Sequence, residues 1–333
     1  MRVNGFHDNH YSYQSDYNRD YLVAHHIVAY HEFPLTGTDN QFGSRGDSPV
    51  YFYLLALPLL IKDDIIFLGL LNILLQLGAL VVVYILARSM FGKPVGLIAL
   101  AFFGLSQSIA DQSNFVWQPW IMQFFLLLSL LLLYLAYSRR NYYLMICGVV
   151  IFFFSAALYP VAYTLAPTYL LTLFFILWLQ RKSFVAYVGV FAAFIGTTTI
   201  LYLPLLLYFT KDQHALPSFL TSSHALLTVD FSHILQNLST RGEVFLNFFL
   251  FRDGPLSLFA LLLAYSFVIV SAAYLYYGRQ DKKRKVIVLI LLIGIIQFFA
   301  VIATISVSPI VSFPIRYFTP LLAITIICIA EIV

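Results

Sequence analysis

The ionisable residues near the N-terminus are the first candidates for chemistry. Asp16 and Asp20 are spaced i, i+4, so they share one face if this segment is helical. His25, His26 and His31 follow them, and imidazole and carboxylate groups are common ligands of metal ions. Their spacing fits no compact metal-ligand signature. We therefore expect solvated histidines and no metal site.

The segments that carry these residues belong to a membrane protein. Hydrophobic residues make up 61% of the 333 residues, charged residues make up 10%, and the mean hydropathy is +0.86. Soluble domains carry about 25% charged residues. A soluble domain of this length cannot hide so much apolar surface, whereas a bilayer covers it. Nothing resembles a basic, aromatic-interleaved nucleic-acid surface, so no nucleic-acid partner is expected.

Apolar runs of about 17–25 residues predict an all-α polytopic protein with about nine spans. The spans lie near residues 65–87, 94–110, 116–137, 142–158, 161–180, 184–209, 255–277, 286–308 and 316–333. The shorter apolar stretch from Val50 to Ile61 predicts a segment that dips into the membrane or lies along its surface. The chain therefore divides into a first outer loop, 1–64, and a helical domain, 65–333.

The links between the predicted spans alternate between basic and non-basic, and Lys and Arg are retained in the cytoplasm. This places residues 1–64, 111–115, 159–160, 210–254 and 309–316 on the extracytoplasmic side of the plasma membrane, together with all eight histidines. The cytoplasmic links have only two acidic residues, Asp281 and Glu331, against eleven basic ones. The basic residues are Arg88, Lys93, Arg139, Arg140, Arg181, Lys182, Arg279, Lys282, Lys283, Arg284 and Lys285. Any chemistry is expected outside.

The first outer loop also predicts a helix. Apolar residues beside the two aspartates suit an amphipathic helix on the membrane surface, namely Leu22, Val23, Ile27 and Val28. This loop must reach the outer side, yet no signal peptide or hydrophobic span precedes it, and Val333 ends the chain inside an apolar run. We expect further sequence at both ends.

Five segments, in order along nearly the whole chain, resemble the GT-C glycosyltransferases. Within that fold the resemblance is to the family-39-like branch, which includes protein O-mannosyltransferases and aminoarabinose transferases. The segments are Asp16 with Asn18-Arg19-Asp20, Pro49 to Ala56, Tyr84 to Gly92, Ser113 to Pro119, and Arg316 to Pro320. Many relatives have two adjacent acidic residues where this chain has Asp16-Tyr17. The identity of the principal carboxylate, Asp16 or Asp20, is therefore left open.

The resemblance implies a sugar donor linked to a polyprenyl phosphate, and a glycan, lipid or protein acceptor outside the cytoplasm. In such enzymes a carboxylate takes the proton of the acceptor hydroxyl, and a cation balances the departing phosphate. It assigns the base role to Asp16, with Asp20 as its alternative or partner. Some relatives use a divalent cation and others do not.

The resemblance also suggests the remaining site residues. The donor phosphate is assigned to Arg316, with Arg19 and Arg45 as weaker candidates. Asn114, Trp117, Gln118 and Tyr317 are the candidates for substrate contact. For Arg316 and Trp117 a role as interfacial anchors stays open, because Arg and Trp are common at the ends of membrane spans. The long outer loop at 210–254 suits a lid or an acceptor-side element.

Two other classes of function compete with the enzyme. A transporter or lipid flippase usually carries ionisable residues near mid-membrane and broken helices in matching repeats. Here the spans are almost free of charge, no repeat is evident, and Asn72 and Gln76 suit contacts between helices. A third possibility is an inactive truncated relative. The sequence favours the enzyme.

Overall fold

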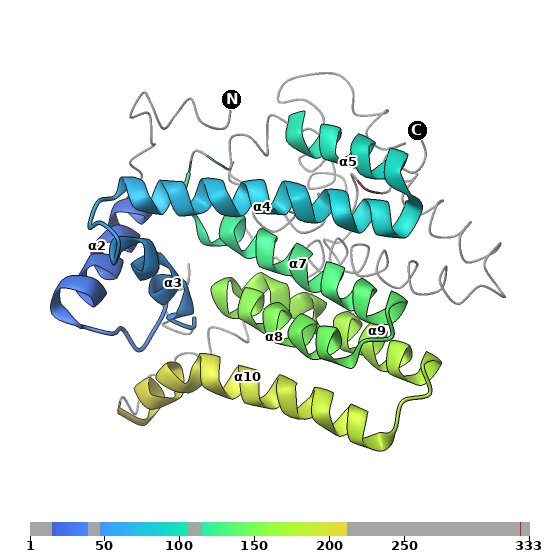
Figure 1. Ribbon diagram of the computed structural model, residues 1–333. Coiled ribbons are helices and arrows are strands. Elements are labelled where there is room, and N and C mark those ends of the chain that lie inside the picture. Colours follow the sequence, from blue (N-terminus) through green and yellow to red (C-terminus); the bar gives the residue numbers. More distant parts are fainter. Residues whose placement is uncertain (1–14, 39–46, 106–112, 114, 212–326, 328–333) are drawn as a thin grey trace, which may run out of the picture.

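The computed structural model describes residues 15–38, 47–105, 113, 115–211 and 327, and these residues are helical or lie in links between helices (Figure 1). The elements are α2 (Ser15–Tyr30), α3 (Val50–Leu59), α4 (Ile66–Phe91), α5 (Lys93–Leu105), α7 (Gln118–Ser138), α8 (Tyr142–Leu158), the 3₁₀ helix η1 (Pro160–Leu165), α9 (Ala166–Leu179) and α10 (Phe184–Lys211). The predicted all-α fold class is confirmed.

Three described helices, α4, α7 and α10, are long and apolar enough to cross a membrane. A helix satisfies its own backbone hydrogen bonds, so it is the natural way for an apolar chain to enter a bilayer. The apolar helices α5, α8 and α9 are shorter. Described helices thus lie in each of the first six predicted spans, and Ile327 is the one described residue of the three spans predicted after residue 254. The chain is an integral membrane protein.

The segment predicted as one span over 161–180 is divided in the structure. Its first residues form η1, and α9 begins only at Ala166. Pro160 opens η1 and Pro167 lies in the first turn of α9. Proline has no backbone N–H to donate, and it is tolerated in a first turn but not inside a continuous helix. The two prolines therefore account for the break.

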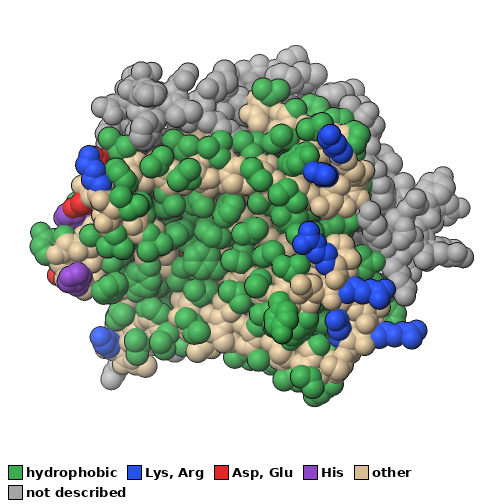
Figure 2. All heavy atoms as spheres, in the orientation of Figure 1, with side chains coloured by type: hydrophobic (Ala, Val, Ile, Leu, Met, Phe, Trp, Pro, Cys, Tyr) green, Lys and Arg blue, Asp and Glu red, His purple; other side chains and the backbone are tan. Residues whose placement is uncertain are grey.

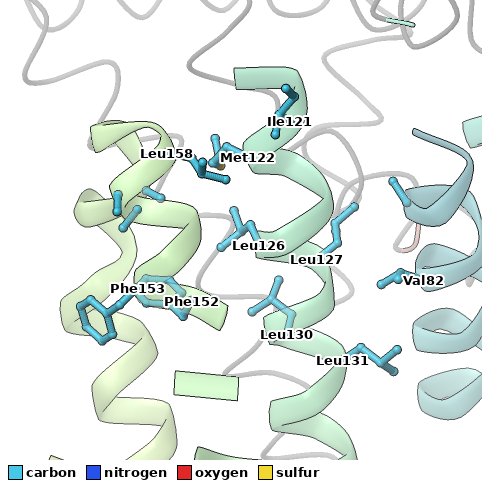
Figure 3. Close-up of a cluster of buried hydrophobic side chains, with 14 of the residues drawn as sticks. Val82, Ile121, Met122, Leu126, Leu127, Leu130, Leu131, Phe152, Phe153 and Leu158 are labelled. Carbon is cyan, nitrogen blue, oxygen red and sulfur yellow. The ribbon is translucent and has the colours of Figure 1, made fainter. Parts of the chain in front are cut away.

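The helix α7 forms the centre of the bundle. Figure 3 shows its leucines, Leu126, Leu127, Leu130 and Leu131, between Phe152 and Phe153 of α8 and Val82 of α4. All of these side chains are buried. Close packing of this kind gives a rigid scaffold, because each side chain loses contacts if its neighbour moves. The two ends of the bundle are held in place by this core.

The two ends of the bundle differ in charge. Figure 1 shows α2 and α3 at one end, beside the start of α4 and of α7. Figure 2 shows the acidic and histidine side chains at that end, and most lysines and arginines at the opposite end. We call the first the acidic end; it comprises α2, α3 and residues 60–65. The basic end comprises the last turns of α4, α7 and α9 with the links that follow them.

The helix predicted in the first loop is α2, and one of its faces packs against the rest of the fold. Tyr17, Asp20, Ala24 and Ile27 are buried, at the three- and four-residue spacing of one helix face. Leu22 lies off this face, and 54% of its surface is exposed. The face of α2 that packs within the protein therefore carries an aspartate and an aromatic residue, and Leu22 lies outside it.

Candidate functional site

Two aspartates of α2 share one arginine at the acidic end. The Nη1 atom of Arg19 lies 3.1 Å from Oδ1 of Asp16. Its Nε and Nη2 atoms donate to Oδ1 of Asp20 at 3.0 and 2.7 Å. Arg19 lies three residues after Asp16 and directly before Asp20, so one helical turn brings the three groups together. The structure therefore joins both candidate carboxylates through a single cation.

The two carboxylates have different surroundings. The side chain of Asp16 is 45% exposed, whereas that of Asp20 is 1% exposed. Tyr51 of α3 donates its hydroxyl to the second oxygen of Asp20, Oδ2, at 3.0 Å. Both oxygens of Asp20 are therefore occupied within the fold. The oxygens of Asp16 have one contact, that of Oδ1 with Arg19, among the interactions of the described residues.

Burial controls the protonation of Asp20. Removal from water raises the pKa of this carboxyl to about 6, and the charge of Arg19 with the hydrogen bonds from Arg19 and Tyr51 offsets only part of the rise. The raised pKa places the titration of Asp20 close to the physiological range. Strongly perturbed carboxyl groups with a specific charge partner are frequent at functional sites.

Tyr17 fixes the orientation of α2 against the bundle. Its ring is buried, and its hydroxyl donates to the backbone carbonyl oxygen of Ile65 at 2.9 Å, just before α4 begins. Tyr17 occupies the position beside Asp16 where many relatives of the resembled family have a second acidic residue. In this chain that position serves to attach the helix rather than to supply a second charge.

A second polar group lies between α2 and the link that precedes α4. Oδ2 of Asp63 lies 2.7 Å from Nδ1 of His25, and the Tyr21 hydroxyl donates to Oδ1 of Asp63 at 3.3 Å. A shallow depression of about 560 Å³ adjoins it, lined by Asn18, Tyr21, Leu22, Asp63, Asp64 and Ile65. His26 pairs with Glu32 at 3.0 Å, and both side chains are exposed. Within the described ranges, no three histidine, cysteine, aspartate or glutamate residues are grouped to hold a metal ion.

The carboxylate of Asp47 was not among the residues predicted for the site. Burial raises its pKa to about 6, although a hydrogen bond with the Thr38 side chain acts in the opposite direction. The backbone N–H of Gly37 donates to the Asp47 carbonyl at 2.7 Å, and Asp47 is partly buried. The one available signal was its place directly before Ser48 and Pro49, at the start of an apolar run.

Gln118 and Trp117 lie at the junction of the loop and the bundle. Gln118 is buried, and its Nε2 atom donates to the Thr38 hydroxyl at 3.0 Å. Trp117 packs between the rings of Phe115 and Trp120, with centroids 5.7 and 5.6 Å away. The hydrogen bond of Gln118 ties the first loop to the start of α7, whereas these ring contacts of Trp117 are with its neighbours in the chain. The other candidates, Arg45, Asn114, Arg316 and Tyr317, lie outside the described residues.

Comparison with solved structures identifies the fold. ArnT from Cupriavidus metallidurans bound to undecaprenyl phosphate matches with a TM-score of 0.62 and 11% identity, over 96% of this chain and 55% of that one. Its apo structure gives the same TM-score. The archaeal oligosaccharyltransferase AglB from Archaeoglobus fulgidus, in complex with an inhibitory peptide and a dolichol-phosphate, also matches. Its TM-score is 0.55 and its identity 14%, over 95% of this chain and 45% of that one.

The matches cover nearly all of this chain but only about half the length of those proteins. No protein-family model and no curated protein matches the sequence. At 11% and 14% identity the likeness shows the fold alone. The predicted GT-C fold is thereby confirmed.

Proposed function

We propose that this protein is a membrane glycosyltransferase that moves a sugar from a polyprenyl-phosphate donor to an acceptor on the extracytoplasmic side. The observation that carries the proposal is the Asp16–Arg19–Asp20 group, which lies at the acidic end of a GT-C fold. The group combines an accessible carboxylate, a cation and a buried carboxylate. The donor class is supported by two of the matched structures, one bound to undecaprenyl phosphate and one in complex with a dolichol-phosphate.

Asp16 is the general base in this proposal. Its half-exposed carboxylate has room for an acceptor hydroxyl, whereas both oxygens of Asp20 are already occupied. The acceptor oxygen forms a bond to C1 of the sugar as the bond from C1 to the phosphate oxygen breaks. The hydroxyl proton passes to Asp16, and the polyprenyl phosphate leaves with the bonding electrons. One substrate proton is thus transferred for each sugar moved.

Arg19 and Asp20 act on the reaction through Asp16. Tyr51 holds Asp20, Asp20 holds the guanidinium of Arg19 from the buried side, and Arg19 in turn lies 3.1 Å from one oxygen of Asp16. The second oxygen of Asp16 has no contact among the described residues, and in this proposal it faces the acceptor. Correct placement of a reacting group contributes strongly to rate, and a displacement of about 1 Å can cost about 10²-fold. We therefore assign Asp20 a positioning role.

The donor phosphate needs a cation other than Arg19. The guanidinium of Arg19 already faces two carboxylates, so little of its charge remains for a phosphate. This favours Arg316 as the donor-phosphate residue, with Arg45 as the alternative, and both assignments remain proposals from the sequence. Trp117 is half-buried at the junction and retains its proposed contact with substrate.

A transporter or flippase is the less favoured function. Among the described apolar helices from α4 to α10, charged side chains occur only near helix ends: Arg88, Lys93 and Lys211. The amides of Asn72 and Gln76 donate to backbone carbonyls of the neighbouring segment, at 2.9–3.2 Å. A substrate path through the membrane usually requires ionisable groups near its centre. The polar groups of this bundle serve packing instead.

The test is a transfer assay with the purified protein in lipid nanodiscs. Radiolabelled polyprenyl-phosphate sugars are supplied one by one with membrane extract as the acceptor source, and label that leaves the lipid is counted. We expect release from one donor and its loss in Asp16→Asn. The matched control is Glu32→Gln, which removes an exposed acid of the same loop that contacts only His26 in the described structure. Movement of intact donor lipid across the bilayer without sugar release would instead identify a flippase.

A further inference from the structure

A cavity at the basic end of the bundle has no role in the proposed reaction. Its volume is about 730 Å³, within the range of small-molecule sites. It opens between the last turns of α4, α7 and α9, far from α2 and α3 (Figure 1). Seven of its nine lining residues carry polar groups: Ser89, Tyr134, Tyr137, Ser138, Arg140, Gln180 and Arg181, with Leu135 and Leu179. We call it the basic pocket.

The two arginines of the basic pocket occupy equivalent positions. After α7, the N–H of Arg140 donates to the carbonyl of Tyr137 and that of Asn141 to Ala136. After α9, the N–H of Arg181 donates to the carbonyl of Trp178, and the N–H of Lys182 donates to the carbonyl of Leu177. Both helices thus end in a Schellman motif. Each motif places an arginine at the position that glycine usually occupies.

This position is unfavourable for arginine. The φ angles of Arg140 and Arg181 are 52° and 51°, in the left-handed region that L-residues other than glycine rarely adopt. Both arginines nevertheless line the same cavity. Strained residues that gather at one place are a reason to look for a function there. Their shared position favours a ligand that needs two guanidinium groups.

Three backbone carbonyls beside the basic pocket already accept hydrogen bonds from side chains. The Tyr134 hydroxyl donates to the carbonyl of Ser89 at 2.8 Å. Nε2 of Gln180 donates to the carbonyls of Ala136 and Tyr137, both at 3.2 Å. Helix C-termini normally repel anions through such exposed carbonyls. Here that repulsion is reduced, because donors cover the carbonyls.

The basic pocket lacks a negative partner in the part of the chain that the structure describes. All acidic residues in that part precede residue 65, and no ion pair involves Arg140 or Arg181 there. Oε1 of Gln180 is also buried without a hydrogen-bond partner among those residues. The pocket therefore offers two cations and one acceptor. A ligand that matches it brings an anionic group together with a hydroxyl donor.

We propose that the basic pocket binds the phosphate of an anionic glycerophospholipid in the leaflet at the basic end. Arg140 and Arg181 donate to the phosphate oxygens, for which guanidinium groups are well suited. Gln180 accepts a hydrogen bond from a headgroup hydroxyl. The apolar helices end at this level, and basic pockets between membrane helices are known to bind lipid headgroups. This inference does not depend on glycosyl transfer.

The test uses the delipidated protein in detergent, incubated with phosphatidylglycerol and examined by native mass spectrometry. We expect one retained lipid on the wild type and about tenfold lower retention in the Arg140→Gly/Arg181→Gly variant, because each lost charge-assisted contact weakens binding. Glycine accepts positive φ angles, so this variant is expected to melt at the wild-type temperature or above it without lipid. A loss of lipid is then not a loss of fold.

The matched control is Arg139→Gln, which removes one positive charge from the same link but does not line the basic pocket. It is expected to retain the lipid as the wild type does. Equal retention by the double variant and the wild type overturns the proposal. A second arm adds millimolar inorganic phosphate, which is expected not to displace the lipid. If phosphate alone protects the protein from heat and phosphatidylglycerol does not, the ligand is a soluble phosphate and the lipid assignment is wrong.

Discussion

The acidic and basic ends both contain arginine, but they hold it in different ways. At the acidic end, Arg19 lies between two carboxylates, one of which is fully buried and contacted by Tyr51 from another helix. At the basic end, Arg140 and Arg181 are placed by the local geometry of helix ends, and no described carboxylate pairs with them. The first arrangement depends on tertiary packing. The second depends mainly on where a helix stops.

This contrast distinguishes residues that can take part in a reaction from residues that only set the orientation of the chain in the membrane. A signal that keeps a link in the cytoplasm needs only positive charge in a short loop. A reacting carboxylate needs a defined neighbour and a defined exposure to solvent. Asp16 and Asp20 share Arg19, but the side chain of Asp16 is half-exposed and that of Asp20 is buried. The acidic end therefore has the properties of a site, whereas most of the basic end requires no partner beyond water and lipid.

The largest effect is expected from Asp16→Asn. If the accessible carboxylate takes the acceptor proton, its replacement lowers the transfer rate by about 10²–10⁴-fold, the range for general-base catalysis. The melting temperature should remain close to that of the wild type, because a half-exposed ion pair contributes little to stability. Both are measured on the same preparation by label release and thermal denaturation. Full activity in Asp16→Asn would remove the base role from this residue.

Replacement of the buried partner, Asp20→Asn, separates activity from stability. Transfer should fall by about 10²-fold, because Arg19 loses the anion that positions it. The pKa of Asp20 is raised to about 6 from 3.8, so its contribution to stability is complete below pH 4 and is lost as the pH rises through 6. Between pH 4.5 and pH 7.5 the variant should therefore gain about 2 kcal/mol relative to the wild type.

The control for this pH dependence is Asp64→Asn. The backbone N–H of Ile66 lowers the pKa of Asp64, which places its titration below this pH window. Its stability difference from the wild type should therefore be flat between pH 4.5 and pH 7.5 in denaturant titrations. A flat profile for Asp20→Asn as well would show that the Asp20 carboxyl is not perturbed by burial.

A smaller change is expected from Tyr51→Phe. The hydroxyl stabilises the charged form of Asp20, so its removal raises the pKa of that carboxyl. The transfer rate of the wild type should fall on the acid side near pH 6, and the variant should show the same fall at higher pH. Tyr53→Phe is the control, since its hydroxyl donates to the carbonyl of Pro34 instead. An identical acid limb in Tyr51→Phe and Tyr53→Phe would disconnect Asp20 from activity.

The smallest effect is expected in the middle of the bundle, between the two ends. Gln76→Ala removes the hydrogen bond to the carbonyl of Trp120 and should destabilise the protein by about 1 kcal/mol, as for other polar contacts between membrane helices. Transfer per folded molecule should not change. Leu77→Ala on the exposed side of α4 gives the baseline for loss of a side chain at the adjacent position. A selective loss of transfer in Gln76→Ala would reassign this region to the substrate path.

The sequence predicted the features that depend on composition and period. Apolar runs located α4, α7 and α10, and the i, i+4 spacing of Asp16 and Asp20 placed both near Arg19. What it missed depends on distant contacts. Neither the burial of Asp20 under Tyr51 nor the raised pKa of Asp47 follows from neighbouring residues in the chain. The same holds for Gln118, whose contact with Thr38 joins residues 80 positions apart.

The first loop is fastened to the last described helix, and this has a consequence for biogenesis. The Ser48 hydroxyl donates to the carbonyl of Leu201 in α10 at 2.8 Å, across 153 residues of chain. At ribosomal rates of about 5–20 residues per second, roughly 8–30 s separate the synthesis of these two residues. During that interval the loop has left the ribosome without its anchor. The attachment of the first loop to α10 is therefore a late event in membrane insertion, and a nascent chain arrested before α10 would lack it.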